Sequence, residues 1–312
     1  MSSATRIGII GLGRMGQNHA RVLSTMRGAD LVALFDVDAD RNREVAARYA
    51  TKAATNAEEL LDSVDAVIVA SPTTSHADYV SLAADRVRKI FVEKPLTDAS
   101  QSSRQLAQLV REKGVGLQVG FIERYNPALT QLADLLQSSE QVISLDFFRT
   151  NRVSERITDV DVVTDLMIHD LDLALHLNGP VAETIADGVA RGSMIDFANA
   201  TLRHQNGRVS RVQASRITDR KARRVEATCS DCFVECDLLR REITVSRRAE
   251  VVQKPGMPYR ITTIEERIEV PPQEALLAEL RAFLENEPGP AADDAVNAIE
   301  LCETIREIVL NQ

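Results

Sequence analysis

One glycine loop constrains the fold more than any other feature of the sequence. It reads Gly11-Leu12-Gly13-Arg14-Met15-Gly16, follows the short apolar run 6–10 and leads into a helical pattern that continues to about residue 26. Asp36 stands twenty residues after Gly16, at the end of the next apolar run. A strand, a GxGxxG turn, a helix and an acidic residue at this distance are typical of a dinucleotide-binding βαβ unit.

The residue types in this loop fit the binding of a pyrophosphate. Gly11 permits a tight turn, Gly13 lets the backbone approach the phosphates, and Gly16 lets the helix pack closely on the strand. The first helical turn, which includes Arg14 and Met15, offers free N–H groups and the positive end of the helix dipole. We therefore expect this loop to hold the phosphates of a dinucleotide.

Asp36 favours NAD over NADP as that dinucleotide. Its carboxylate is able to accept hydrogen bonds from the adenosine ribose hydroxyls, whereas it repels a 2′-phosphate. Arg41 and Arg43 follow a few residues later and are able to reach a phosphate. A solvated helix face is the simpler interpretation of both arginines, so NAD is the predicted cofactor.

Strand and helix patterns alternate through the first third of the chain. Apolar runs at 30–36, 66–70, 89–93 and 116–120 are separated by helical patterns. This alternation predicts a parallel sheet covered on both faces, and right-handed crossovers make it doubly wound. We expect an α/β chain with an NAD-binding Rossmann domain over residues 1–121.

A different rhythm follows in residues 122–312. Strand-like segments connected by turns predict a mostly antiparallel open sheet, and residues 163–177 read as a helix. We expect this second α/β domain to serve substrate binding and oligomerisation, with a last helix able to pack back on the N-terminal domain. The strand-like segments are 141–149, 194–204, 208–217, 222–229, 232–238 and 241–247.

Composition and charge exclude several classes of function. The chain has 37 basic and 46 acidic residues, a net charge of −9, so it lacks the basic surface that a nucleic-acid binder needs. No apolar run is long enough for a membrane-spanning helix. The N-terminus has no signal-peptide pattern, so we expect a cytoplasmic protein.

Three cysteines raise the question of a metal site. Cys229, Cys232 and Cys236 combine CxxC spacing with a third thiol. A structural zinc site takes four ligands, and these cysteines flank a short turn between two strand-like runs. We therefore expect reduced, partly buried thiols and no metal.

Three further motifs point to a known family. They are Glu93-Lys94-Pro95, the segment 120–127 (GFIERYNP) and the segment 165–170 (DLMIHD). Together with the glycine loop they resemble the Gfo/Idh/MocA family of nicotinamide-dependent sugar and polyol oxidoreductases, over essentially the whole chain. The resemblance implies a C-terminal α/β domain whose open sheet forms a homodimer or homotetramer interface.

The resemblance also places Lys94, Asp165 and His169 beside the nicotinamide and the substrate. Oxidation of a secondary alcohol needs a base for the hydroxyl proton, and a neutral histidine suits that task near pH 7. Asp165 and His169 are four residues apart, so on a helix they share a face, where Asp165 orients the imidazole or holds a substrate hydroxyl. Lys94 follows a strand whose end lies at the ligand-binding edge of an open α/β sheet, and its ammonium is able to stabilise a developing alkoxide.

More site residues follow from the resemblance. It places the loop that begins at Ser71 beside the cofactor, and it places Arg124 and Asn126 along the cofactor and substrate cleft. The predicted cofactor-binding residues are Gly11, Gly13, Arg14, Met15, Gly16, Asp36, Ser71, Pro72, Thr73, His76, Glu93, Lys94 and Arg124.

The segments 123–127 and 159–170 look like the branch of the family that oxidises the C3 hydroxyl of UDP-N-acetylglucosamine to a ketone, although Asp161 stands where we expect glycine in that branch. A nucleotide-sugar needs partners for its pyrophosphate, and arginines just before the catalytic helix are able to supply bidentate contacts; solvated arginines are the alternative. The predicted substrate-binding residues are Lys94, Arg124, Asn126, Arg149, Arg152, Arg156, Asp165 and His169.

Two alternatives stay open. One is an inositol, free-sugar or ketosugar oxidoreductase of the same family. The other is a non-catalytic NAD-sensing protein on the same scaffold, although a sensor would not need Lys94, Asp165 and His169 together.

Overall fold

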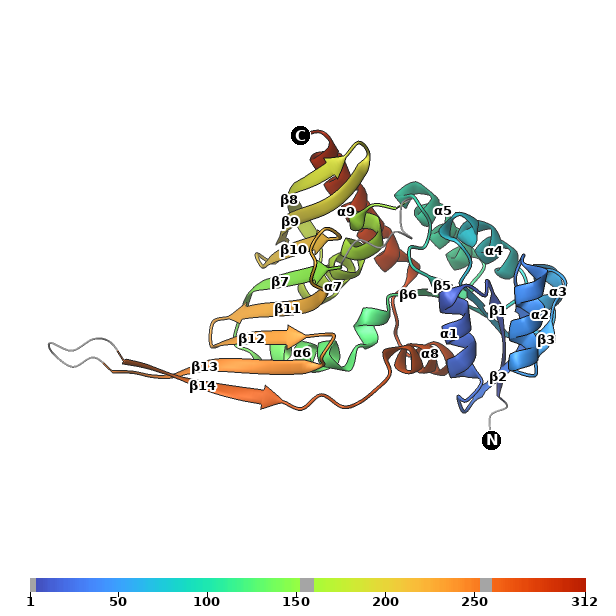
Figure 1. The fold of residues 1–312 in the computed structure, drawn as a ribbon, viewed down its shortest axis with the longest axis horizontal. Helices are drawn as coiled ribbons and strands as arrows, with labels where there is room; N and C mark the ends of the chain where they lie inside the picture. The colour runs from blue at the N-terminus through green and yellow to red at the C-terminus, as the bar shows by residue number, and fades with distance from the viewer. Residues whose placement is uncertain (1–3, 152–159, 253–259) are drawn as a thin grey trace. The chain divides into compact units, whose positions relative to one another are not determined.

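The computed structural model describes residues 4–151, 160–252 and 260–312. The chain divides into two compact units, drawn in Figure 1. Unit 1 comprises Met1–Ile122 and Glu274–Glu300, and unit 2 comprises Glu123–Gln273 and Leu301–Gln312. The first segment of unit 1 ends one residue after the predicted boundary at 121, and residues 274–300, which include the beginning of the last helix, also belong to this unit.

Unit 1 contains a six-stranded parallel sheet with the strand order β3-β2-β1-β4-β5-β6. The order reverses between β1 and β4, and ligands of open α/β sheets bind at such a switch point, outside the carboxyl ends of the strands. The strands are β1 (Thr5–Ile10), β2 (Ala29–Phe35), β3 (Lys52–Ala53), β4 (Ala66–Val69), β5 (Lys89–Glu93) and β6 (Gly116–Gly120).

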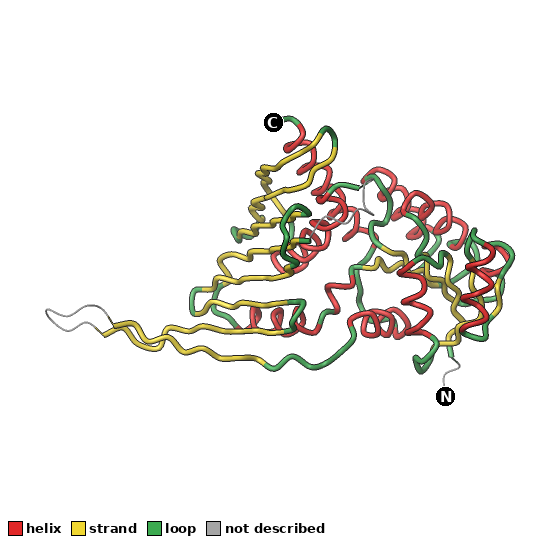
Figure 2. The backbone as a smooth tube through the Cα atoms, viewed as in Figure 1, coloured by secondary structure: helices red, strands yellow, loops and turns green. Residues whose placement is uncertain are grey.

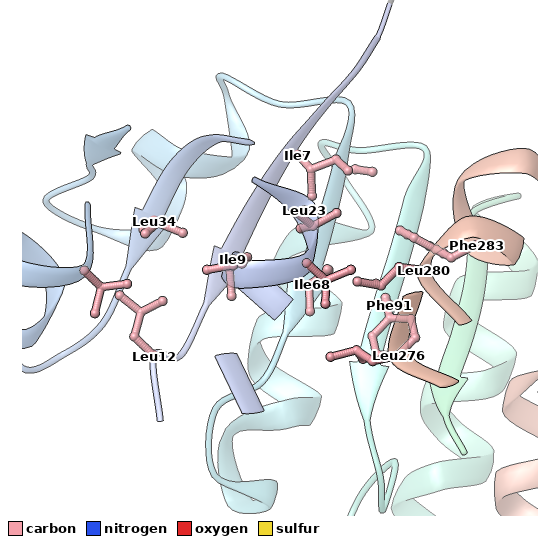
Figure 3. Packing of buried hydrophobic residues seen from close by; sticks show 14 of the residues in the cluster. Ile7, Ile9, Leu12, Leu23, Leu34, Ile68, Phe91, Leu276, Leu280 and Phe283 are labelled. Atoms are coloured by element: carbon pink, nitrogen blue, oxygen red, sulfur yellow. The ribbon is translucent and has the colours of Figure 1, made fainter. Parts of the chain in front are cut away.

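Helices cover both faces of this sheet, as the doubly wound prediction requires. On one face Ile7 and Ile9 of β1 join a buried cluster with residues from three helices, shown in Figure 3. On the other face a Cβ at Gly8 would stand 2.5 Å from Cδ2 of Leu60, so this glycine lets a helix approach the strand. The helices are α1 (Arg14–Leu23), α2 (Ala39–Arg48), α3 (Ala57–Leu61), α4 (His76–Ala83), α5 (Ser100–Glu112) and α8 (Ala275–Glu285), with the 3₁₀ turn η1 (Thr73–Ser75).

Helix α8 explains why residues 274–300 belong to unit 1. The helix contributes three side chains to the same cluster, Leu276, Leu280 and Phe283 (Figure 3). The Phe283 ring packs edge-on against the ring of Phe91 in β5, with 5.7 Å between the ring centroids. Burying a side chain of this size contributes about 1.5–3 kcal/mol. This helix was not predicted from the sequence. Helix α9 (Ala292–Leu310) begins in unit 1 and ends in unit 2.

Unit 2 is built on an eight-stranded sheet with the order β14-β13-β12-β11-β7-β10-β9-β8, traced in yellow in Figure 2. Each neighbouring pair is antiparallel except β7 and β10, which confirms the predicted mostly antiparallel sheet. The strands are β7 (Val142–Thr150), β8 (Val181–Arg191), β9 (Met194–His204), β10 (Val209–Ser215), β11 (Ala222–Cys229), β12 (Cys232–Asp237), β13 (Glu242–Val252) and β14 (Arg260–Ile268). Of these, β8 and β14 were not predicted.

Helices of unit 2 pack on one face of this sheet. They are α6 (Pro127–Ser138), the π-helix η3 (Val163–Met167) and α7 (Ile168–Asn178), while the 3₁₀ turn η2 (Ile122–Tyr125) precedes α6. Strand β12 shows the two faces, because Cys232, Val234 and Cys236 are buried while Phe233 between them is exposed. Within the described part of the chain, no helix has the length and apolar character to cross a lipid bilayer.

Candidate functional site

The glycine loop of unit 1 has the geometry that a pyrophosphate requires. Gly11 has φ +90°, and a Cβ there would stand 2.4 Å from the backbone nitrogen of Ser71. A Cβ at Gly16, in the first turn of α1, would stand 1.9 Å from the carbonyl oxygen of Gly11. A Cβ at Gly13 would meet no described atom within 4 Å. Gly11 and Gly16 therefore permit close packing, whereas Gly13 leaves room for a ligand beside the start of α1.

A cavity of about 430 Å³ opens beside this loop, at the carboxyl ends of β1, β2 and β4. Its lining includes the predicted residues Gly11, Gly13, Asp36, Ser71 and Pro72. Val37 and Tyr79 also line the cavity and were not among the residues predicted from the sequence. Tyr79 packs edge-on against Phe35 at the end of β2. The residues present fit a dinucleotide, with room for the adenosine beside an acidic side chain.

Asp36 is held rigidly at the edge of this cavity. Its Oδ2 accepts a hydrogen bond from the backbone nitrogen of Leu12 at 2.6 Å, and its Oδ1 accepts one from Asp38 at 2.9 Å. Nη1 of Arg41 lies 3.4 Å from Oδ1. These contacts fix the orientation of the carboxylate at the cavity, and Arg41 lines the cavity as well, so it does not belong only to a solvated helix face.

His76 contacts the protein backbone on both sides of its ring. Nδ1 lies 2.9 Å from the carbonyl oxygen of Pro95 and Nε2 lies 2.9 Å from that of Ser71. The residue is 1% exposed. His76 therefore connects the loop of Ser71 with the turn that follows Lys94, and its place among the cofactor-binding residues stays a prediction.

Glu93 also has a protein partner. At the end of β5, its Oε1 lies 2.7 Å from Nε2 of the fully buried His19 in α1. Lys94 follows directly, half-buried at the carboxyl end of β5. Glu279 of α8 is buried with neither oxygen partnered among the described residues. Burial first, and the charge of Glu93 second, raise the pKa of Glu279 well above its ordinary value.

Arg149 lies at the centre of a buried charge cluster in unit 2. Its Nε and Nη2 donate to the two oxygens of Asp170, each at 2.7 Å, and its Nη1 donates to Oε1 of Glu123 at 2.9 Å. Arg223 donates to the same Glu123 oxygen at 3.0 Å. Arg149 is 2% exposed. These contacts argue against the predicted pyrophosphate contact, because each nitrogen of the guanidinium already donates to a carboxylate.

The pKa values of the two acids reflect this burial. Burial raises the pKa of Asp170 more than Arg149 lowers it. At Glu123 burial acts in the same direction, but the charges of Arg149 and Arg223 outweigh it and lower the pKa. The cluster is therefore a structural element in which Arg149, assisted by Arg223 at Glu123, compensates two buried carboxyl groups.

Arg124 and Asn126 also have partners within unit 2. Arg124 forms a bidentate pair with the buried Asp172 of α7, with distances of 2.5 and 2.8 Å. Oδ1 of Asn126 accepts the backbone N–H of Ala128 at 3.1 Å and so caps α6, with Pro127 in the first turn. The segment that contains them thus fixes α6 and α7.

Asp165 and His169 lie on consecutive helical segments of unit 2. Asp165 is in the π-helix η3, and His169 is the second residue of α7. Both are half-buried. The predicted single helix over 163–177 is therefore a π-helical turn followed by an α-helix, and π-helical turns occur frequently at functional sites. Arg152 and Arg156 lie outside the described residues.

The three cysteines near the β11–β12 turn are buried and not bridged. Burial is the main cause that raises the pKa of Cys229 to about 11 and that of Cys236 to about 12. Among the described residues, no group of three or more histidine, cysteine or acidic side chains is arranged to hold a metal ion.

Comparison with known proteins supplies the context for this geometry. Residues 5–121 match the model of the oxidoreductase family with an NAD-binding Rossmann fold, and residues 143–235 match the GFO/IDH/MocA C-terminal domain. A UDP-N-acetylglucosamine 3-dehydrogenase from Acidithiobacillus ferrooxidans is 31% identical over 281 residues, which cover 89% of this chain and 87% of that protein.

A solved structure and a relative that acts on inositol are also similar to this chain. A solved structure of UDP-N-acetylglucosamine 3-dehydrogenase from the same organism superposes with a TM-score of 0.89 at 28% identity and covers 99% of both chains. A scyllo-inositol 2-dehydrogenase (NAD(+)) from Bacillus subtilis is 30% identical over 243 residues, 70% of this chain and 69% of that protein.

Proposed function

Because this chain belongs to the Gfo/Idh/MocA family of NAD-dependent oxidoreductases acting on the CH–OH groups of sugars and polyols, we propose that its substrate is a nucleotide-sugar. The hydroxyl oxidised is that at C3 of UDP-N-acetylglucosamine or a close analogue, and the product is the 3-ketone.

One observation carries this proposal. The similarity to the UDP-N-acetylglucosamine 3-dehydrogenase extends over 89% of this chain, whereas the similarity to the scyllo-inositol dehydrogenase extends over 70%. The relative that acts on the UDP-sugar is therefore similar to a larger share of this chain than the relative that acts on inositol. Oxidation of inositol or a free sugar is the second candidate, because a relative that acts on inositol is almost as similar over the shorter range.

The cofactor contacts follow from unit 1. Gly11, Gly13 and Gly16 would hold the pyrophosphate at the start of α1, and the rigid carboxylate of Asp36 would receive the ribose hydroxyls. Bound NAD supplies the hydride acceptor of the reaction. The fixed position of Asp36 disfavours a 2′-phosphate, so NADP is expected to bind more weakly.

The catalytic roles belong to Lys94, Asp165 and His169. His169 takes the proton of the substrate hydroxyl, since a neutral imidazole is a suitable base near pH 7. Lys94 donates a hydrogen bond to the same oxygen and stabilises its developing negative charge. Asp165 orients His169 or holds a neighbouring hydroxyl. For the pyrophosphate of the sugar nucleotide, Arg152 and Arg156 remain the candidates once Arg149 is assigned to the buried cluster.

The assembly and cellular location are further parts of the proposal. The sheet of unit 2 carries exposed apolar side chains, among them Ile185, Val189 and Phe233, which fit an interface between copies of the chain. We expect a homodimer or homotetramer that does not bind nucleic acid. We also expect a cytoplasmic location, where NAD and nucleotide-sugars are both available.

A substrate panel with matched variants tests the function. NADH formation is followed by absorbance with UDP-N-acetylglucosamine, myo-inositol, scyllo-inositol and free N-acetylglucosamine, and we expect the highest kcat/KM for the UDP-sugar. Lys94→Met and His169→Asn should each lower kcat by about 10²–10⁴-fold while the Kd for NAD stays near the wild-type value. Lys113→Met, which breaks a surface pair with Asp85, is the control and should keep full activity.

Each other outcome has a definite meaning. A higher kcat/KM for an inositol would replace the nucleotide-sugar with a polyol. NAD binding without turnover of any panel member would favour the sensor alternative. Near wild-type turnover by the Lys94 or His169 variant would refute the role given to that residue.

A further inference from the structure

The start of the π-helix that carries Asp165 is fixed by a side chain from outside the predicted catalytic set. Oδ1 of Asp161 accepts hydrogen bonds from the backbone nitrogens of Val163 at 3.1 Å and Thr164 at 3.0 Å. The backbone carbonyl of Asp161 accepts the amide of Asp165 at 3.0 Å. A helix start has amide groups without helical partners, so Asp161 supplies two of them with an acceptor and a negative charge of the favourable sign.

The second oxygen of the same carboxylate contacts the last helix. Nε of Arg306 in α9 donates to Oδ2 of Asp161 at 2.5 Å. Asp161 is 4% exposed, and burial of its charge is costly without a partner. Arg306 therefore compensates the charge and fixes the carboxylate in the orientation that caps the π-helix.

One more contact joins the same two segments. The thiol of Cys302, one helical turn before Arg306, lies 3.7 Å from the carbonyl oxygen of Val163. The first turn of the π-helix is thus attached to the C-terminal part of α9 at its carboxylate cap and at a carbonyl. Both contacts lie within unit 2.

We propose that Asp161 and Arg306 are positioning residues for the reaction, which set the orientation of Asp165 and, through the continuous helical segment, that of His169. This inference rests on the proposed function, because it gives the pair a task only if Asp165 and His169 act on substrate. A displacement of about 1 Å at a catalytic group is able to cost up to about 10²-fold in rate. The pair therefore acts on kcat without contacting substrate.

Arg306→Gln is the test variant, because it removes the charge and leaves Asp161 in place. Arg191→Gln is the matched control: Arg191 also pairs through Nε with the buried Asp196 at 2.5 Å, in the same unit but in strands β8 and β9. Arg306→Lys is the rescue variant, since its ammonium is able to donate to the same oxygen.

Amide hydrogen exchange measures how well Asp161 caps the π-helix, and it needs no substrate. In Arg306→Gln we expect at least about tenfold faster exchange at the amides of Val163 and Thr164, with wild-type exchange in Arg191→Gln. In steady-state kinetics with the substrate selected above, Arg306→Gln should lower kcat about tenfold. The KM for NAD should stay unchanged, because the glycine loop lies in unit 1, and Arg306→Lys should recover most of kcat.

Asp161→Asn completes the experiment, because the asparagine Oδ1 still accepts the two amides while the charge is lost. We expect the double variant with Arg306→Gln to be no slower than the slower single variant. Unchanged exchange at Val163 and Thr164 in Arg306→Gln would overturn the proposal. Equal loss of kcat in Arg191→Gln, or failure of Arg306→Lys to recover activity, would show a general loss of stability and would overturn it too.

The proposed function and this inference fail in different ways. If wild-type protein turns over no panel member, the proposed function fails and the positioning role falls with it, while exchange still reports whether the cap exists. If wild-type protein is active and Arg306→Gln retains its kcat, only the inference fails.

Discussion

Replacing Arg149 with methionine should destabilise unit 2 severely. Arg149→Met keeps much of the apolar volume but leaves Asp170 and Glu123 in a buried site without their shared partner. Removing one partner of a buried ion pair costs about 3–5 kcal/mol, because the remaining charge is uncompensated. Arg223 still contacts Glu123, so most of the cost falls on Asp170.

The stability lost in Arg149→Met should depend on pH. In the wild type, burial already raises the pKa of Asp170, and loss of Arg149 removes a charge that lowers it, so the pKa rises further in the variant. A carboxyl group with a raised folded pKa is most favourable below its unfolded pKa of about 3.9 and loses stability as pH rises. The lowered pKa of Glu123 in the wild type contributes stability that is present at neutral pH and lost on acidification. The difference in free energy of unfolding between wild type and variant should therefore be largest near neutral pH and should decrease toward pH 4.

Urea unfolding followed by circular dichroism, at fixed protein concentration and several pH values, measures the free energy of unfolding. Arg203→Gln is the control, since Arg203 pairs with Glu183 while both are mostly exposed, and its loss should cost less than about 1 kcal/mol. A loss below about 1 kcal/mol in Arg149→Met, together with a raised KM for the UDP-sugar, would refute this reasoning and restore Arg149 as a substrate contact.

Three further predictions concern unit 1. Glu279→Gln should raise the free energy of unfolding above about pH 4.3, and by more as pH rises, because burial and Glu93 raise the pKa of Glu279 and the wild type loses stability over that range. Urea titrations at several pH values measure this. A difference between variant and wild type that does not change with pH would contradict it. Gly16→Ala should abolish NAD binding or folding of the loop, because its Cβ would stand 1.9 Å from the carbonyl oxygen of Gly11; calorimetry with NAD measures it, and a wild-type Kd would disprove the steric argument. Asp36→Asn should weaken NAD and strengthen NADP binding, about tenfold in their ratio of Kd values, because the repulsion of a 2′-phosphate is removed; an unchanged ratio would contradict it.

Much of unit 1 follows from local sequence patterns. The GxGxxG loop, the alternation of apolar runs with helical patterns and the position of Asp36 each carry a local signal, and the parallel sheet forms as they predict. Helix α8 was missed although the spacing of Leu276, Leu280 and Phe283 is a local helical signal. Its partners on β5 and α1 are far away in sequence. Its attachment to unit 1 depends on packing that no local pattern shows.

Among the site residues, too, those with a local sequence signal were easier to predict than those that depend on distant partners. The loop glycines and Asp36 were predicted as cofactor contacts because their chemistry is local, and the structure places Gly11, Gly13 and Asp36 in the lining of one cavity. Arg149 was misjudged, although alternation along β7 held a signal: Leu145, Phe147 and Arg149 share one face of the strand, and all three are buried. Its partners on other elements were not available from sequence, and the cap of Asp161 on the π-helix likewise appears only in three dimensions.

Transfer of a labelled hydrogen tests the central claim most directly. UDP-N-acetylglucosamine carrying deuterium at C3 is incubated with the wild-type protein and NAD, and the NADH formed is analysed by mass spectrometry. The account predicts NADH that carries the deuterium, together with a UDP-sugar that has lost the label and become a ketone at C3. NADH without deuterium would place the oxidation at another carbon, and absence of NADH with this substrate, while an inositol is oxidised, would contradict the nucleotide-sugar assignment.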